Sequence, residues 1–205
     1  RKILKNPRVK LFFTSYFFNS FATSIPATII IFYVRDYLNA ENYLGLFLLI
    51  YFLSGAASMP LWKYFSNKFS SIYSWFLSMI FAFLSFIWAF FLEPNNIIGF
   101  FIICLLSGIA VGANLALPST IIAEDINSNN TQDYASSYYS ISNFLSKFAL
   151  AIASGVSLPI LGFLGYVPGM ARNDALLPFV YAILPCCILL ISIYLTSKLL
   201  NKSSI

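Results

Sequence analysis

Residues 97–123 read IIGFFIICLLSGIAVGANLALPSTIIA, and none of these 27 residues carries a charge. An α-helix needs about 17–25 mostly apolar residues to cross the hydrocarbon core of a bilayer. The stretch is long enough, and its polar residues are small or uncharged. It therefore predicts a transmembrane helix.

Five further stretches of the chain are also uncharged or nearly uncharged, and only the fifth of the six contains a charge, Lys147. Over the whole chain, 60% of residues are hydrophobic and 9% are charged, whereas soluble domains carry about 25% charged residues. The linkers are short and rich in turn residues, which leaves no room for a soluble domain. We predict an all-α membrane protein in which residues 1–205 form a single six-helix transmembrane domain. The predicted spans are approximately 11–34, 43–62, 70–92, 97–123, 134–167 and 175–197.

The basic residues are distributed unequally between the two sides of this six-span arrangement. Nine Lys and Arg residues fall on the side of the two termini, whereas Arg35 and Arg172 fall on the other. Basic residues near span ends are retained in the cytoplasm. We therefore expect a multi-pass protein of the cytoplasmic (inner) membrane with both termini in the cytoplasm. The nine residues are Arg1, Lys2, Lys5, Arg8, Lys10, Lys63, Lys68, Lys198 and Lys202.

The residue inventory argues against an enzyme. Histidine, the commonest general base and metal ligand, is absent. We find no cluster of ligating residues at metal-binding spacing and no phosphate-binding glycine loop. The three cysteines, Cys104, Cys186 and Cys187, lie inside apolar runs, where we interpret them as small packing residues. We expect no cofactor, no metal site and no nucleic-acid partner.

Glycine is used unevenly among the six spans. Spans 2, 4 and 5 contain glycines and spans 3 and 6 contain none. Because small residues let membrane helices approach closely, we expect spans 2, 4 and 5 to be central and spans 3 and 6 to be peripheral. In span 4, Gly108, Gly112 and Ala116 form a small-residue ridge, which we interpret first as a helix-packing surface. Asn114 and Pro118 lie off that ridge.

Span 1 carries one polar stripe on an otherwise Phe-rich helix. Ser15, Asn19, Thr23 and Pro26 recur at spacings of four, four and three, which places them on one face of a helix. Such hydroxyl and amide groups either bond neighbouring helices or line a polar cavity. The sequence leaves both interpretations open.

Span 5 carries a lysine far from either membrane surface. Lys147 continues a stripe formed by Ser136, Ser140, Asn143 and Ser154. It lies about 20 Å along the helix from the start of the span, and a lysine at this depth costs about 2.5–3.5 kcal/mol to insert. Every acidic residue of the chain lies in a linker or at a span end. Lys147 is therefore predicted to face water, a substrate or an acid on another polypeptide, the alternative being a structural or snorkelling role.

Several of these residues carry a resemblance to a known family. The chain resembles the C-terminal half of the glycoside–pentoside–hexuronide:cation symporters, the melibiose-permease-like branch of the major facilitator superfamily, over essentially all of its length. The most specific marker is Lys147 followed by the stretch LGFLGYVPG at 161–169. The other markers are Lys5-Asn6-Pro7-Arg8 before the first helix and Gly108, Gly112, Leu117-Pro118 and Ala123-Glu124 in the fourth.

The resemblance implies a twelve-helix transporter built from two six-helix halves. In that family the first and fourth helices of this half line the cavity, the third and sixth are outer, and the matching lysine lies close to the sugar and cation sites. Coupling carboxylates are mainly in the N-terminal half. The partners implied are the lipid bilayer, a missing N-terminal half supplied in cis or in trans, a small polar solute, and H⁺ or Na⁺ as coupling cation. The candidate cavity residues are Lys147, Asn143, Ser142, Ser146, Asn19, Thr23 and Asn114.

Two positions depart from the family pattern. The aromatic residue that stacks on sugar in the melibiose permease falls near Asn114 or Leu115, and the polar pair before the lysine becomes Ser142 and Asn143. The first departure argues against a galactoside as substrate.

Three functional hypotheses follow from the sequence. The first is half of a cation-coupled symporter of a sugar or related solute, and the second is an orphan fragment or structural subunit without transport activity. The third is a membrane enzyme, for which Glu124 and Asp125 alone provide an acidic pair.

Overall fold

The computed structural model describes residues 6–169 and 175–203, and these residues form helices and short connections without a strand. Six helical segments are long and apolar enough to cross a membrane, as predicted. The elements are α1 (Pro7–Phe32), η2 (Tyr33–Tyr37), η3 (Glu41–Tyr43), α2 (Leu44–Lys68), α3 (Ser71–Phe90), α4 (Ile97–Ser128), η4 (Gln132–Tyr134), α5 (Ala135–Phe163), α6 (Leu176–Pro178), η5 (Phe179–Ile183) and α7 (Leu184–Ser203).

Polar side chains fix the starts of three membrane-spanning helices. The Asn6 side chain accepts from the backbone N–H of Arg8 at 3.0 Å, directly before Pro7 opens α1. Ser70 caps α3 and Asn96 caps α4 in the same way. Each cap satisfies a backbone donor that the first helical turn leaves without a partner. The linkers that are rich in turn residues therefore end at the residues where these helices begin.

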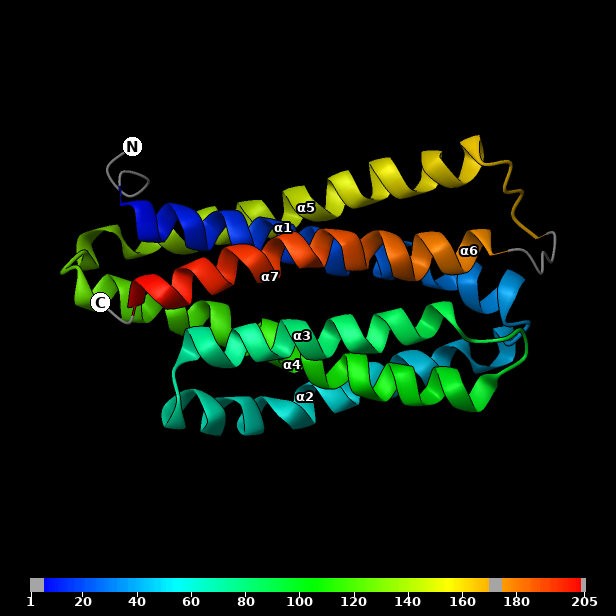
Figure 1. The fold of residues 1–205 in the computed structure, drawn as a ribbon, viewed down its shortest axis with the longest axis horizontal. Helices are drawn as coiled ribbons and strands as arrows, with labels where there is room; N and C mark the ends of the chain where they lie inside the picture. The colour runs from blue at the N-terminus through cyan, green and yellow to red at the C-terminus, as the bar shows by residue number, and fades with distance from the viewer. Residues whose placement is uncertain (1–5, 170–174, 204–205) are drawn as a thin grey trace.

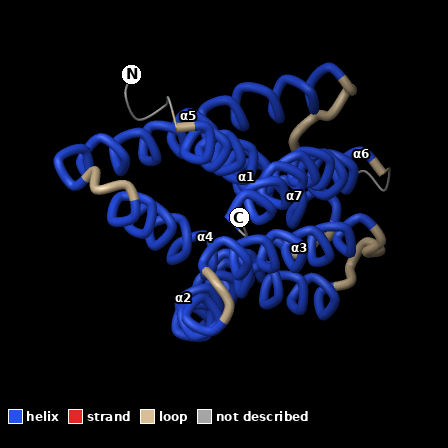
Figure 2. Tube along the Cα trace, turned by 60° about the vertical axis from the view of Figure 1, so that its left-hand side comes forward, coloured by secondary structure: helices blue, strands red, loops and turns tan. Residues whose placement is uncertain are grey.

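The helices form two layers of three (Figure 2). In one layer α1 packs between α5 and α7, and in the other α4 packs between α2 and α3. The layers meet where α3 contacts α7, and α1 and α4 are joined by a hydrogen bond between their side chains. Both termini lie at the same end of the bundle (Figure 1), which we call the terminal end; the other is the far end.

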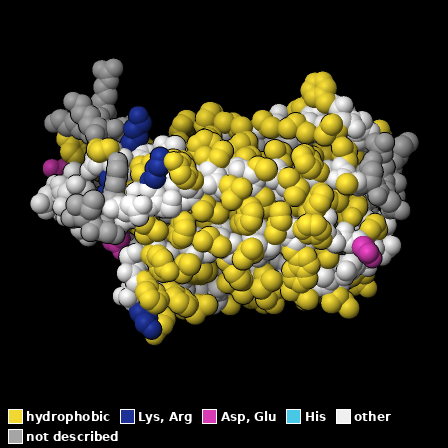
Figure 3. Space-filling model, viewed as in Figure 1, with side chains coloured by type: hydrophobic (Ala, Val, Ile, Leu, Met, Phe, Trp, Pro, Cys, Tyr) yellow, Lys and Arg dark blue, Asp and Glu magenta, His cyan; other side chains and the backbone are white. Residues whose placement is uncertain are grey.

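Charge and apolar surface are segregated along the long axis. On the face seen in Figure 3, hydrophobic side chains cover the middle, and the basic side chains gather at the terminal end. The interior contains two apolar clusters, one built around Trp75 and Phe12 and the other around Tyr33 and Phe100. An apolar belt between polar ends is the surface that a bilayer-spanning protein presents.

Within the described six-helix bundle, burial does not follow the glycine content of the spans. Half of the apolar core of α3, of α4 and of the last span is buried, whereas only 17% of the second span and 22% of the fifth are. Helix α3 packs closely without glycine because its buried face is built from small serines and alanines. Those residues are Ser71, Ser74, Ser78, Ala82, Ser85 and Ala89.

The small-residue ridge of α4 does pack as predicted. A Cβ added to Gly108 would lie 2.4 Å from the carbonyl oxygen of Tyr51, and one added to Gly112 would lie 2.4 Å from that of Gly55. Both carbonyls belong to α2, so these two helices touch backbone to backbone. By contrast, Gly155 has nothing within 4 Å of such a Cβ. Glycine therefore marks close packing in α4 and open surface in α5.

Candidate functional site

The polar contact between α1 and α4 is built from two amides and an indole. The Nδ2 of Asn19 and the Nε1 of Trp75 both donate to the Oδ1 of Asn114, each at 2.9 Å. Asn19 and Trp75 are buried, while Asn114 is half-buried and its neighbour Leu115 is exposed. Asn114 therefore lies where the bundle interior meets the surface between α1 and α4.

Thr23 lies one helical turn beyond Asn19 and lines a small cavity. Its hydroxyl donates to the backbone oxygens of Asn19 and Ser20, so it is bonded within its own helix. The cavity has a volume of about 120 Å³ and is enclosed by α1, α2, α3, α4 and Tyr181. Most of its lining is apolar or aromatic, including Phe52 and Phe86, and Ser107 lines it as well.

Lys147 lies on a face of α5 that the rest of the bundle does not cover. Its side chain is exposed and forms no hydrogen bond or ion pair with any residue in 6–169 or 175–201. Asn143, one turn earlier, is also exposed. The buried face of α5, which contains Ala149, Ala153 and Ser157, packs against α1 instead. The predicted stripe is thus open from Ser136 to Lys147, whereas Ser154 is half-buried and its hydroxyl lies 3.4 Å from that of Thr28 on α1.

Ser142 and Ser146 do not share that open position. Ser142 is buried and its hydroxyl donates to the backbone oxygen of Tyr139. Ser146 is half-buried and donates to the backbone oxygen of Asn143. Each hydroxyl is therefore satisfied by the helix that carries it, and Ser142 faces the bundle rather than the open side. Of the four residues predicted on α5, Lys147 and Asn143 present free polar groups.

The site residues on three helices lie at one depth. Asn19 and Lys147 each lie 12 residues from the terminal-end start of their helix, and Asn114 lies 14 residues from the terminal-end finish of α4. At 1.5 Å per residue these offsets correspond to about 18–21 Å along each helix. The structure thus groups Asn19 and Asn114 directly, and places Lys147 level with them on the neighbouring helix α5.

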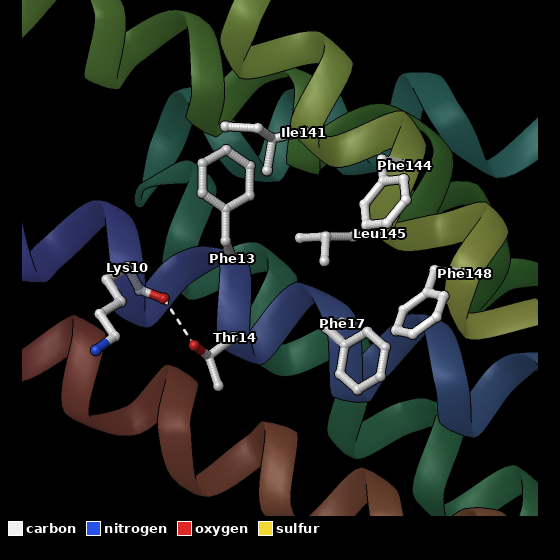
Figure 4. Close-up of a pocket in the computed structure, with 8 residues that line it drawn as sticks. All are labelled: Lys10, Phe13, Thr14, Phe17, Ile141, Phe144, Leu145 and Phe148. Atoms are coloured by element: carbon white, nitrogen blue, oxygen red, sulfur yellow. Dashed lines mark hydrogen bonds between the residues drawn. The ribbon is translucent and has the colours of Figure 1, made fainter. Parts of the chain in front are cut away.

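A larger groove between α1 and α5 is not part of this site. It has a volume of about 410 Å³, and Figure 4 shows its lining, in which Phe13, Phe17, Phe144 and Phe148 predominate. The α5 residues that line the groove are Ile141, Phe144, Leu145 and Phe148. The polar stripe of α5 consists of other residues, Ser136, Ser140, Asn143 and Lys147. At 3.6 residues per turn these are different faces of the helix.

A buried carboxylate ties two segments together at the far end. Asp36 accepts from the Tyr166 hydroxyl, from the backbone N–H of Gly169 at 3.1 Å and from the Arg35 guanidinium at 2.7 and 3.0 Å. Burial and the Asp36 carboxylate raise the pKa of Tyr166, which keeps its phenol protonated as a donor. Tyr166 and Gly169 belong to the stretch 161–169 that carried the family resemblance. That stretch therefore anchors the end of α5 to the end of α1.

A second ion pair, at the terminal end, joins one layer to the other. Arg8 Nε lies 3.3 Å from Asp125 Oδ1, and the Asp125 side chain is 3% exposed. The two atoms are close enough for an ion pair but are not aligned as a hydrogen bond. Arg8 opens α1 and Asp125 lies in the last turn of α4, so the pair joins the ends of these two helices.

The described residues contain no group of three or more side chains that could hold a metal ion. Cys104, Cys186 and Cys187 are free thiols. The polar groups that the structure brings into contact here are the amides of Asn19 and Asn114 and the indole of Trp75.

A profile of one protein family, described as MFS/sugar transport protein, matches residues 1–199. The chain belongs to this family. It is also similar to the sodium-dependent lysophosphatidylcholine symporters 1-A and 1-B of Danio rerio, with 27% and 29% identity over 128 residues. These matches span 60% and 58% of the chain and 24% of each symporter, so the chain aligns with about a quarter of the length of these relatives. The narrower resemblance to the melibiose-permease branch stays a prediction.

Three features of this MFS transporter chain escaped the sequence analysis. Trp75 received no role, although it is the one large polar-tipped residue on the serine-rich face of α3. The pairs Arg8–Asp125 and Asp36–Tyr166 were also missed, although acids at the ends of apolar spans are a usable signal because they need a partner when buried. Four residues of the positive-inside count, Arg1, Lys2, Lys5 and Arg172, lie outside the described residues.

Proposed function

We propose that this chain is the C-terminal half of a secondary active transporter that couples a sugar or related small polar solute to H⁺ or Na⁺ across the cytoplasmic membrane. The observation that carries the proposal is the ammonium of Lys147, which is midway along a membrane-spanning helix, exposed, and without a partner in the described chain. Membership of the MFS/sugar transport protein family supports the transport function.

The uncovered faces of α5 and α2 support a missing second half. A lysine that faces hydrocarbon at mid-membrane is costly, so the Lys147 side of α5 must face water or another polypeptide. Each of α2 and α5 packs mainly against one helix, α4 and α1 respectively. An N-terminal six-helix half, supplied in cis or in trans, would cover these helices and enclose a cavity between them. The greater length of the two lysophosphatidylcholine symporters is consistent with this arrangement.

The polar groups at mid-depth suit a small solute. The Asn114 Nδ2 and the Lys147 ammonium have no protein partner in the described chain. Thr23 and Asn143 each lie about one helical turn from the depth of these two groups, in opposite directions along the membrane normal. A cavity at the interface of two rocking halves, near the membrane midplane, is the usual location of a transporter substrate site. Lys147 would either bind substrate oxygens or pair with a carboxylate of the other half that binds the coupling cation.

A second substrate class has its own support. The cavity beside Thr23 is lined mainly by apolar and aromatic side chains, and the two relatives are named for a lysophospholipid. An amphiphile with a polar head near Lys147 and an acyl chain among these side chains fits that lining. An orphan fragment or structural subunit without transport activity is the remaining alternative, and it requires no solute to reach Lys147.

The orientation is proposed from charge. Five of the described basic residues lie at the terminal end, and Arg35 lies at the far end. The five are Arg8, Lys10, Lys63, Lys68 and Lys198. The positive-inside rule then puts the terminal end, with both chain termini, in the cytoplasm.

The test compares two lysines in the complete transporter that contains this chain. Lys147→Ala and Lys147→Arg should abolish uptake, because neither variant keeps a compact ammonium at the site. Lys198→Ala is the matched control: Lys198 lies over the Tyr194 ring near the end of the last span, so its loss should leave uptake unchanged.

Uptake of labelled glucoside, glucuronate and lysophosphatidylcholine is measured in vesicles with H⁺ or Na⁺ gradients, at matched protein levels. Parental uptake by Lys147→Ala would show that the lysine is structural. Absence of uptake of all three probes by the parent would favour the structural-subunit alternative.

A further inference from the structure

The side chain of Asn114 is held in one orientation by its two donors. The indole of Trp75 has an N–H and no acceptor, so the atom that faces it must be the Asn114 oxygen. Asn19 approaches that same oxygen at 2.9 Å and must therefore present its own NH₂ group. The hydrogen-bond chemistry thus fixes both amides without ambiguity, and it commits the Asn114 oxygen to the bundle interior.

This arrangement leaves the Nδ2 group of Asn114 free to donate a hydrogen bond to a ligand. Its oxygen is used twice, while its Nδ2 has no protein partner in residues 6–169 and 175–201 and is not among the buried unpaired atoms. The Nδ2 group is accordingly accessible. A ligand at this position meets two N–H bonds and no acceptor, so it must bring an acceptor oxygen.

The hydrogen bond from Asn19 to Asn114 leaves the Asn19 side-chain oxygen without a partner. Its Oδ1 is buried and has no hydrogen-bond partner in the described chain, and Asn19 itself is 2% exposed. An unpaired buried acceptor of this kind is unfavourable and calls for an explanation. The Asn19 amide cannot turn over to relieve it, because two amide oxygens would then face each other at 2.9 Å. The unpaired Asn19 oxygen is explained if the function of these hydrogen bonds is to orient Asn114.

Trp75 is itself rigidly placed. It is fully buried, and its ring packs against Phe12 and Tyr16 of α1 at centroid distances of 5.5 and 6.4 Å. A buried indole held by two aromatic rings has one available orientation, so its N–H is a fixed reference for the Asn114 oxygen. The chain offers a second buried indole for comparison: Trp62 donates to the backbone oxygen of Ile109 at 2.8 Å, at the contact of α2 with α4.

We propose that Asn114 contacts the transported solute as a hydrogen-bond donor to an acceptor oxygen, and that Trp75 is the positioning residue that fixes this donor. The inference rests on the proposed function and narrows it. The solute must place a hydroxyl, carboxylate or phosphate oxygen at Asn114, and a group that can only donate, such as an ammonium, is rejected there.

The experiment uses Trp75→Phe, with Trp62→Phe as its matched control, in the complete transporter with the three labelled probes named above. Both variants keep an aromatic ring and lose one indole N–H. Trp75→Phe frees the Asn114 amide to turn over, so KM should rise about two- to tenfold with a smaller change in kcat. Trp62→Phe loses a bond to a backbone carbonyl and should keep the parental KM. Equal KM values for the two variants would overturn the positioning role.

A second variant tests the donor itself. Asn114→Asp keeps an oxygen for Trp75 and Asn19 and replaces the NH₂ by a second acceptor, so KM should rise at least tenfold for a probe that offers only acceptors, such as a phosphate group. A neutral hydroxyl can turn and donate, so a glucoside should lose less, which distinguishes the two sources of the oxygen. An unchanged KM for every probe would refute the contact.

A spectroscopic measurement separates this inference from the proposed function. In protein labelled with ¹⁵N at tryptophan, Asn114→Leu should move the indole resonance of Trp75 and leave that of Trp62 in place, whether or not any probe is transported. If the parent transports none of the probes, the proposed function fails and so does the contact. A Trp75 resonance unaffected by Asn114→Leu would instead refute the positioning geometry alone.

Discussion

The contact between α2 and α4 makes a sharp prediction for Gly112. A Cβ at this position would lie 2.4 Å from the carbonyl oxygen of Gly55 and 2.0 Å from the hydroxyl of Ser58. Ser58 can rotate its hydroxyl, although it would give up bonds to Gly55 and Ile109. The Gly55 carbonyl is backbone and about 1 Å short of ordinary contact, so α2 would have to move away from α4.

The expected cost can be set against the intrinsic benefit of alanine. Overpacking of this kind costs about 1–3 kcal/mol, whereas replacing a mid-helix glycine by alanine gains up to about 1 kcal/mol. Gly112→Ala should therefore lose about 1–2 kcal/mol of unfolding free energy. Gly155→Ala is the matched control, because nothing lies within 4 Å of its Cβ. It should gain up to about 1 kcal/mol.

The assay is thermal unfolding of the purified chain in one detergent, followed by the loss of monodisperse protein after heating. Gly112→Ala should melt below the parent and Gly155→Ala at or above it, with roughly 2–4 °C for each kcal/mol. If Gly112→Ala melts at the parental temperature, the two helices do not touch backbone to backbone. If both variants shift downward together, the open surface assigned to α5 is wrong.

Three further outcomes are expected. Tyr166→Phe removes a hydrogen bond to the buried Asp36 carboxylate and should lower the unfolding free energy by about 1.5–3 kcal/mol, as measured by the same melt; an unchanged melting temperature would argue against the anchor. Arg8→Ala and Asp125→Ala should be non-additive, because the first single variant leaves Asp125 buried and unpaired; additive losses in a double-mutant cycle would mean that the pair contributes nothing. A reporter active only outside the cytoplasm should stay inactive when fused to the C-terminus, and strong activity would reject the proposed orientation.

The sequence was sufficient for the spans and insufficient for their lateral order. Apolar length with at most one charge identified all six membrane-crossing segments, because the bilayer imposes a minimum length on each. Lateral order depends on which small residues face a neighbour, and composition alone does not say this. Gly155 and Ser78 are both small, yet the first faces open space and the second is buried in α3. The π-helical turns at Tyr33–Tyr37 and Phe179–Ile183 also had no sequence signal.

The site was predicted in part, for a similar reason. Helical period placed Asn143 and Lys147 on one face of α5, and the structure leaves that face open. Ser142 was included because the family resemblance has a polar pair before the lysine, although one residue along a helix is a rotation of about 100°. Trp75 could not be assigned, because its role depends on a contact between α3 and α4 that the sequence does not specify.

The hydrogen-bond partners of each polar side chain distinguish the structural polar residues from the functional candidates. Period alone put Ser15 and Thr23 on one stripe of α1 and left both roles open. The Ser15 hydroxyl lies 3.0 Å from that of Ser192 and 2.6 Å from that of Thr196, so it bonds α1 to α7 and is satisfied. Lys147 has no comparable partner in the described chain. Because a membrane interior gives no water to compensate an isolated charge, its partner must come from a solute, a water-filled cavity or another polypeptide. Lys147 is thus an exposed charge at mid-membrane depth without a partner in the described chain, and this is why the proposed site is built around it.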